Sequence, residues 1–185
     1  MRVNPWFASC LLIASAAGFF ATSHLVEKRK TPPFTRETAH VFVAGSQSLA
    51  LLRDGWSWPE TWGTWTSGSV AQLDFPIETR PIGNVVLAIY GRSMSPAGQP
   101  GGQLVRVKVN GEELGTLRFN NEDEIIGGKI EVPERMVQVG QPLRLVFEIA
   151  RPTSPREVLM SADERKLGLA LHRIAARYVP SEYVP

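Results

Sequence analysis

Polar and apolar residues alternate along much of the chain, a pattern that predicts β-strands rather than helices. The alternation is clearest in Gln103–Val109, where valines occupy alternate positions, and it recurs in Leu143–Ile149. Asn110-Gly111 follows the first of these segments, and this pair favours a type I′ turn because both residues need a positive φ. We therefore predict a β-hairpin whose second strand covers residues 113–119.

Other segments have the length and composition of strands and are separated by turn residues. Asn84–Tyr90 is an unbroken apolar run, as expected for a strand buried on both faces. Leu167–Val179 is ambiguous, because leucines alternate at its start whereas Ala170–Arg177 would also suit a helix. Gly168 and the neighbouring strands favour a strand there. Further strands are predicted at 41–43, 48–52, 69–75 and 125–132, and loops at 93–102 and 152–166.

About eight short strands without a long helix predict a mainly β fold. We expect an antiparallel jelly-roll β-sandwich over residues 41–185, preceded by one N-terminal hydrophobic helix. The chain has 185 residues, of which 43% are hydrophobic and 21% charged, so its composition is that of a globular domain.

The start of the chain differs from the rest. Pro5–Ala21 carries no charge and is followed by the basic cluster Lys28-Arg29-Lys30. Its length lies between that of a signal-peptide core and the roughly 20 residues of a membrane span. We predict an uncleaved transmembrane anchor over residues 1–30 and a linker over 31–40, with a cleaved signal segment or a buried helix as alternatives. Small residues would allow close contact with a partner helix, or would simply face lipid. These are Ala14, Gly18 and Ala21.

Charge and ligand chemistry exclude several functions. The net charge is only +2 and no basic stripe is present, which argues against a nucleic-acid-binding protein. A single cysteine allows no intrachain disulfide, and the 3 histidines show no metal-ligand spacing. The sequence therefore predicts no metal site and no cofactor.

Four of the 5 tryptophans lie between Trp56 and Trp65, together with Glu60. Indole rings can stack on sugar rings, and carboxylates can accept hydrogen bonds from sugar hydroxyls. We therefore expect a glycan-binding strip, the alternative being that the rings pack the edge of the sandwich. Trp56 and Trp65 are the expected core members, and Trp58 and Trp62 the expected exposed pair.

Catalytic chemistry has little support. Paired carboxylates such as Glu60 and Asp163 could act in glycoside hydrolysis, but no spacing places two of them at a suitable separation. The sequence contains no GxSxG motif for a serine nucleophile. We predict no catalytic residues.

Several of these segments together resemble a β-sandwich domain of bacterial envelope polysaccharide proteins, which is often appended to membrane-bound glycosyltransferases. The resemblance covers about residues 45–178. Its motifs are Gly55–Glu60, Trp62–Gly68, Ala71–Leu73, Val107–Gly111, Ser154–Glu157 and Ser161–Gly168.

The resemblance implies a carbohydrate-binding-like module in glycan assembly, and an ion pair between Glu60 and Arg165 that supports the fold. We expect a non-catalytic, membrane-anchored accessory subunit of a bacterial polysaccharide synthase or glycosyltransferase that acts in trans. It would contact the glycan, the enzyme or both, at the inner membrane with the domain on the periplasmic side. The alternatives are a structural subunit of a membrane complex without glycan binding, and a glycoside hydrolase or esterase.

Overall fold

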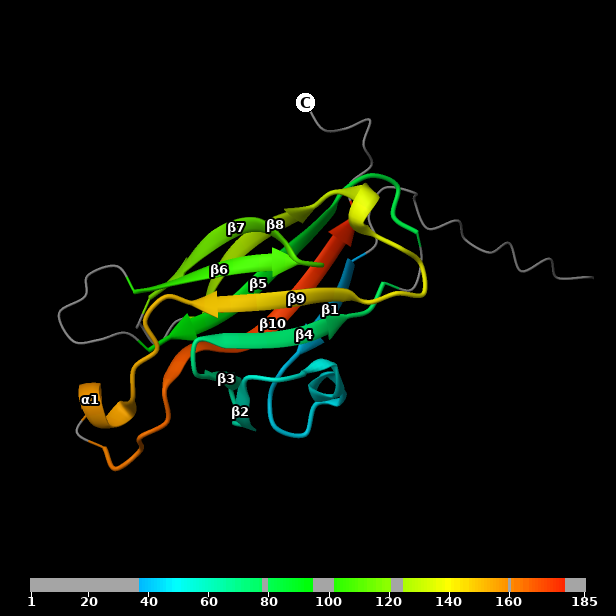
Figure 1. Cartoon of the computed structure of the whole chain (residues 1–185). Coiled ribbons are helices and arrows are strands. Elements are labelled where there is room, and N and C mark those ends of the chain that lie inside the picture. Colours follow the sequence, from blue (N-terminus) through cyan, green and yellow to red (C-terminus); the bar gives the residue numbers. More distant parts are fainter. Residues whose placement is uncertain (1–36, 78–79, 95–101, 121–124, 160, 179–185) are drawn as a thin grey trace, which may run out of the picture. The chain divides into compact units, whose positions relative to one another are not determined.

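The computed structural model describes residues 37–77, 80–94, 102–120, 125–159 and 161–178 (Figure 1). Within these residues the chain is built almost entirely of antiparallel strands. The strands are β1 (Glu37–Val41), β2 (Trp56–Pro59), β3 (Thr64–Ser67), β4 (Val70–Phe75), β5 (Val85–Ser93), β6 (Gln103–Val109), β7 (Glu112–Phe119), β8 (Ile126–Val132), β9 (Leu143–Ile149) and β10 (Leu167–Tyr178). The helices are the 3-10 turns η1 (Gln47–Leu51) and η2 (Glu134–Met136) and the short helix α1 (Pro155–Leu159).

The strands form two sheets that enclose the main hydrophobic core. The six-stranded sheet has the order β2-β3-β10-β5-β8, with β1 also paired to β10. The four-stranded sheet has the order β4-β9-β6-β7. All pairings are antiparallel, so the predicted mainly β, antiparallel sandwich is confirmed.

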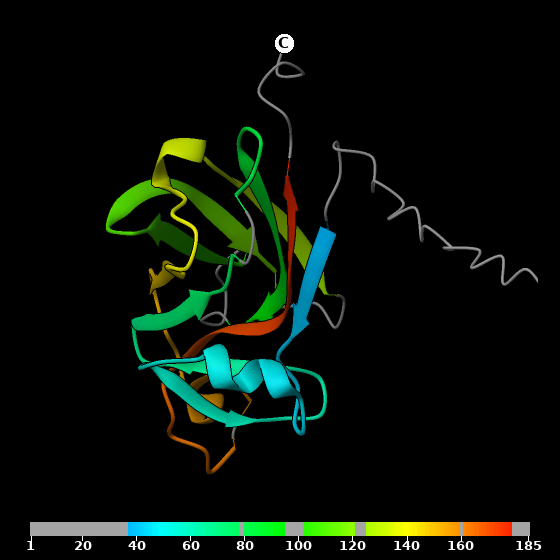
Figure 2. The same ribbon diagram turned by 90° about the vertical axis from the view of Figure 1, so that its right-hand side faces the viewer.

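Strand β10 lies in the middle of the six-stranded sheet. One of its edges pairs along the strand with β5, from Leu169↔Ser93 to Tyr178↔Val85. Its other edge is shared, because β3 pairs with its beginning and β1 with its end. Figure 2 shows β1 running beside β10. This pairing on both edges confirms the strand that the sequence left open to a helical alternative.

The core consists of the inward-facing side chains of both sheets. Burial of each large apolar side chain is worth about 1.5–3 kcal/mol. The largest core residues, each less than 2% exposed, are Phe42, Phe75, Phe119, Phe147, Leu73, Leu87, Ile89, Leu143, Leu145, Leu167, Leu169 and Leu171.

The predicted hairpin is confirmed. Strands β6 and β9 have the bounds that the alternation predicted. Between β6 and β7, Asn110 has φ 49° and Gly111 has φ 89°. Both turn residues thus have the positive φ that a type I′ turn requires.

Three local predictions need correction. Residues 48–52 were expected to form a strand, but Gln47–Leu51 form the 3-10 helix η1, whose first turn is capped when the Ser48 amide donates to the Ser46 hydroxyl. The strand expected at 41–43 ends at Val41 and begins at Glu37. Strand β5 alternates between buried and half-buried residues and is therefore not buried on both faces.

Two further expectations concern the remaining segments. The loop expected at 152–166 contains the short helix α1. The expected anchor at residues 1–30, with Ala14, Gly18 and Ala21, lies outside the described residues. Within the described part of the chain, no helix is both long and apolar enough to cross a membrane.

The packing around Gly55, immediately before β2, gives a test of the fold. Gly55 has φ +84°, and a Cβ atom there would lie 2.0 Å from the carbonyl oxygen of Val70. Gly45 has nearly the same φ, +83°, but a Cβ atom there would meet nothing within 4 Å. Gly45→Ala should therefore cost only the left-handed backbone penalty of about 1–2 kcal/mol.

Gly55→Ala should lower the free energy of unfolding by clearly more than Gly45→Ala, because β2 or β4 must also shift. Urea unfolding followed by tryptophan fluorescence would measure both variants. Equal losses in the two variants would show that Gly55 and Val70 do not pack as described.

Candidate functional site

The tryptophan-rich segment forms a corner of the sandwich, built from β2, β3 and the turn between them. The amide of Glu60 donates to the carbonyl of Gly63 at 2.9 Å and closes this turn. Trp56 pairs with Thr66 and Pro59 with Thr64, so the register shifts between these two pairs. The shift adds one residue to β2, which is the signature of a β-bulge. Because of this bulge, Trp58 does not follow Trp56 into the core.

Trp58 is 62% exposed and is the most exposed large hydrophobic residue of the described chain. The guanidinium of Arg165 lies over its ring, with Cζ 3.7 Å from the ring centroid. Such a cation–π contact is worth about 0.5–1 kcal/mol at an exposed site. Arg165 thus covers and orients one part of an indole that otherwise faces solvent.

Arg165 is itself held by three side chains. Its Nη1 donates to the Ser57 hydroxyl at 2.6 Å, and its Nε donates to the Asp163 carboxylate at 2.9 Å. Its Nη2 lies 3.9 Å from Oε1 of Glu60. The ion pair between Glu60 and Arg165 suggested by the resemblance is therefore present, but Asp163 is the closer partner.

This pairing shifts the titration of both charged groups. The bonds from Arg165 hold the pKa of Asp163 below its usual range, and the same bonds raise the pKa of Arg165. A glycosidase general acid needs a raised carboxyl pKa, so Asp163 lacks the property that this role requires.

Trp62 and Trp65 form a second, small apolar cluster with Leu167 and Ala170. Trp65 is only 6% exposed, and the two indoles meet edge to face with centroids 5.3 Å apart. Cζ of Arg92, from β5, lies 3.2 Å from the centroid of the Trp62 ring. The expected exposure of Trp62 is therefore corrected: it is half-buried beneath an arginine and is not an exposed partner of Trp58.

Trp56 packs on the main core. Its Nε1 donates to the carbonyl of Gln72 at 2.6 Å, and its ring meets Phe147 edge to face at 6.0 Å. Trp65 is buried as expected, and Trp56 is partly buried against the core. Because Trp56 and Trp65 pack inward, Trp58 and Glu60 remain as the candidates for glycan contact within the predicted strip.

The loop that carries Asp163 and Arg165 follows α1 and is bonded to it, because the Arg156 amide donates to the carbonyl of Asp163 at 2.9 Å. The Glu157 amide donates to the Ser154 hydroxyl at 3.3 Å, and the Ser154 amide donates to the Glu157 carboxylate at 2.9 Å. This reciprocal pair is a capping box. Its sequence pattern is a serine followed three residues later by a glutamate, with a proline at the first helical position, as in Ser154-Pro155-Arg156-Glu157. This capping box is a signal in the sequence that the predictions above do not include.

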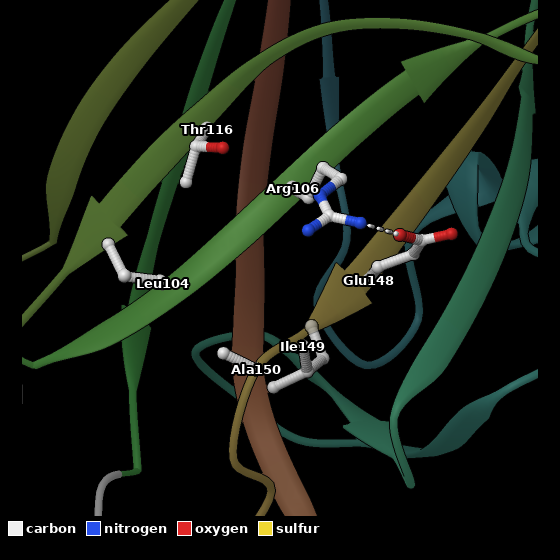
Figure 3. A pocket seen from close by; sticks show the side chains of 6 residues that line it. All are labelled: Leu104, Arg106, Thr116, Glu148, Ile149 and Ala150. Carbon is white, nitrogen blue, oxygen red and sulfur yellow. Dashed lines mark hydrogen bonds and ion pairs between the residues drawn. The ribbon is translucent and has the colours of Figure 1, made fainter.

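Two other arrangements bear on the chemistry of the surface. Among the described residues, no group of three or more histidine, cysteine, aspartate or glutamate side chains could hold a metal ion. A hollow of about 330 Å³ lies on the outer face of the four-stranded sheet (Figure 3). Arg106 points across it to Glu148, with Nη1 3.2 Å from the carboxylate, and also pairs with Glu113 at 3.3 Å. Arg106 is thus already paired with two carboxylates, one of which, Glu148, also pairs with Lys108.

Comparisons with known proteins give distant likenesses only. No protein-family model and no curated protein matches the sequence. The chain is similar to dimeric latent PorU from Porphyromonas gingivalis at 12% identity and TM-score 0.44, over 79% of this chain and 13% of that one. The chain thus spans only a small part of that protein's length.

Two smaller structures align over most of their own length. One is the CBM22-1 xylan-binding domain from Paenibacillus barcinonensis Xyn10C, with 13% identity, TM-score 0.45 and coverage of 78% of this chain and 94% of that one. The other is the CBM36-1 domain of a multidomain xylanase from the hindgut metagenome of Trinervitermes trinervoides, with 13% identity, TM-score 0.43 and coverage of 76% and 96%. At identities and TM-scores this low, the alignments establish neither a family nor a function.

The support of the loop by Glu157 predicts a pH effect. Bonds from Lys166, Ser154 and Thr153 lower the pKa of Glu157 from 4.5 to about 2. Because the pKa of Glu157 is lower in the folded state than in the unfolded chain, ionised Glu157 stabilises the folded state. This stabilisation is fully present above pH 4.5 and is lost as the pH falls toward 2.

Glu157→Gln should therefore lower the free energy of unfolding at pH 7, and its difference from the unsubstituted protein should shrink as the pH approaches 2. Guanidinium unfolding at pH 7, 4 and 2.5 would measure this. Glu164→Gln removes a charge from the same loop without touching the capping box, and serves as the control. A difference that does not change with pH would contradict the assignment.

Proposed function

We propose that this chain is a non-catalytic glycan-binding module in which Trp58 is the principal sugar-contacting residue. The observation that carries the proposal is an indole that is 62% exposed and yet held in place by a stacked arginine. An exposed tryptophan offers a large, flat apolar surface that a ligand can cover and remove from water. Glu60, whose side chain is 29% exposed, lies beside it as an acceptor for sugar hydroxyls.

The position of Arg165 over Trp58, which we call the clamp, lowers the free-energy cost of binding a ligand there. Binding a ligand on a mobile side chain costs about 0.5–1.5 kcal/mol for each side chain that becomes ordered. Arg165 reduces that cost, because Ser57 and Asp163 already fix its guanidinium over the ring. The same clamp leaves Asp163 ionised and occupied, so the proposed role is recognition and not hydrolysis.

We also propose that the module acts as a membrane-anchored accessory subunit of a bacterial polysaccharide synthase or glycosyltransferase. The support is the apolar segment within residues 1–30 and the resemblance of the tryptophan block to domains appended to such enzymes. Tethering would raise the effective concentration of the module at the growing polymer, so a weak stacking contact would suffice. The proposed location is the inner membrane, with the domain in the periplasm.

Trp58→Ala should weaken glycan binding at least about tenfold, because it removes the stacking surface. Affinity electrophoresis of the full-length protein in detergent, through gels containing dextran, xylan or alginate, would measure it. Ile82→Ala is the matched control, since Ile82 is also an exposed apolar residue, at 58%. Unchanged binding by a folded Trp58→Ala variant would overturn the proposed site.

Arg165→Lys tests the clamp separately from the ring. Lysine keeps the charge but loses the planar group that stacks on Trp58 and reaches Ser57 and Asp163 together. We expect binding to weaken by a smaller factor than in Trp58→Ala, with the exposed indole still present. The same gels would measure it, and a loss larger than that of Trp58→Ala would show that Arg165 itself is the main contact.

The accessory role is tested by recovery of the full-length protein from native membranes in mild detergent, followed by mass spectrometry. A glycosyltransferase or polysaccharide synthase in stoichiometric amount would support it. Recovery with a different membrane complex, together with no glycan binding by the protein, would favour the structural-subunit alternative.

A further inference from the structure

A second hollow, of about 350 Å³, lies on the outer face of the six-stranded sheet. It crosses four adjacent strands, β1, β10, β5 and β8. Its lining residues near the end of β10 are far along that strand from the Arg165 corner at its beginning. The lining consists of Glu37, Val86, Ala88, Tyr90, Lys129, Ala175 and Arg177.

The floor of this groove follows from the alternation in β5. Val85, Leu87 and Ile89 are fully buried in the core, so the intervening residues must face outward. Ala88 lies opposite Ala175 of β10 on one side and opposite Lys129 of β8 on the other. Small side chains at the centre and longer ones around them produce a shallow apolar floor with a polar rim.

An aromatic ring stands at one end of the floor and is positioned by two contacts. Tyr90 lies opposite Gly127, where a Cβ atom would come within 2.7 Å of the Tyr90 ring. The guanidinium of Arg173 also contacts the ring, with Cζ 4.3 Å from the ring centroid. Tyr90 is therefore a positioned ring beside an apolar floor, which is the kind of surface that a pyranose can cover.

The charges around the floor are mainly positive. Lys129 and Arg177 are exposed and flank the floor, and Arg173 stacks on Tyr90. Glu37 is the acidic residue of the lining and lies opposite Arg177 in the pairing of β1 with β10. In the hollow on the four-stranded sheet, Arg106 is bonded to two carboxylates. The cations that border the groove thus outnumber the acidic residue of its lining.

We propose that this groove binds a carboxylated oligosaccharide, such as a run of uronic acid residues. Sugar rings would lie on Tyr90 and the alanine floor, while Lys129 and Arg177 would pair with carboxylates. The inference rests on the proposed glycan-binding function for the class of ligand, but it uses residues that are distinct from Trp58 and Arg165. It narrows the ligand from glycans in general to acidic ones.

The experiment measures binding of the full-length protein in detergent to alginate oligosaccharides by isothermal titration calorimetry. The test variant is Lys129→Gln with Arg177→Gln. Its matched control is Arg80→Gln with Arg151→Gln, which removes the same charge from exposed positions outside the groove. Cello-oligosaccharides serve as neutral probes, heparin oligosaccharides as sulfated probes and inorganic phosphate as a bare anion. Lys129→Glu is a second, single variant, and thermal melting checks the fold of each.

We expect the groove variant to bind alginate about tenfold more weakly, with the control variant and the neutral probes unchanged. Unchanged alginate affinity in the groove variant, or an equal loss in the control, would show that the groove is not the binding site. Equal affinity for phosphate and alginate would show that the groove is a general anion site and does not recognise an acidic glycan. Tighter binding of heparin than of alginate would overturn the preference for carboxylates.

Trp58→Ala measured in the same way separates the two proposals. Loss of both neutral and acidic ligands in Trp58→Ala, with the groove variant unaffected, would keep the proposed function and overturn the groove. Loss of alginate in the groove variant, with Trp58→Ala unaffected, would keep the groove and overturn Trp58 as the sugar-contacting residue.

Discussion

Strand β10 is hydrogen-bonded along both edges, and both candidate binding surfaces depend on this pairing. β5 occupies one edge, while β3 and β1 share the other. The register with β5 shifts between Leu171 and Arg173. Before the shift Leu169 and Leu171 enter the core, and after it Ile174 and Ala176 do. The outer face therefore carries Ala170 at one end, beneath the tryptophan cluster, and the groove-lining residues at the other.

The same shift explains why the sequence left this strand ambiguous. Its core positions, 169, 171, 174 and 176, are separated by two, three and two residues, a mixture of strand and helical spacing. The hairpin at Asn110-Gly111 was predictable because its turn chemistry and its flanking alternation agree. The segment at 48–52 was not, because η1 depends on a local cap at Ser46 that a short apolar run does not reveal.

The site was only partly predictable for a related reason. The sequence singled out the tryptophans, but their exposure depends on residues far away in the chain. Arg92 of β5 covers Trp62, whereas the bulge in β2 turns Trp58 outward beneath Arg165. Such long-range contacts leave no periodic signal. The capping box at Ser154 and Glu157 does leave one, and it would have identified the support of the loop that carries Arg165.

The net charge of the chain is only +2, but the charged side chains are arranged differently on the two outer faces of the sandwich. On the four-stranded sheet, Asp74 is bonded to Arg144 and Arg53, and the pairing lowers its pKa despite its burial. Glu148 similarly joins Arg106 and Lys108. In both groups one carboxylate joins two cations, so these cations are held in surface ion pairs. On the six-stranded sheet the cations instead border an apolar floor, so an anionic polymer would find its counter-charges there and an aromatic surface beside them.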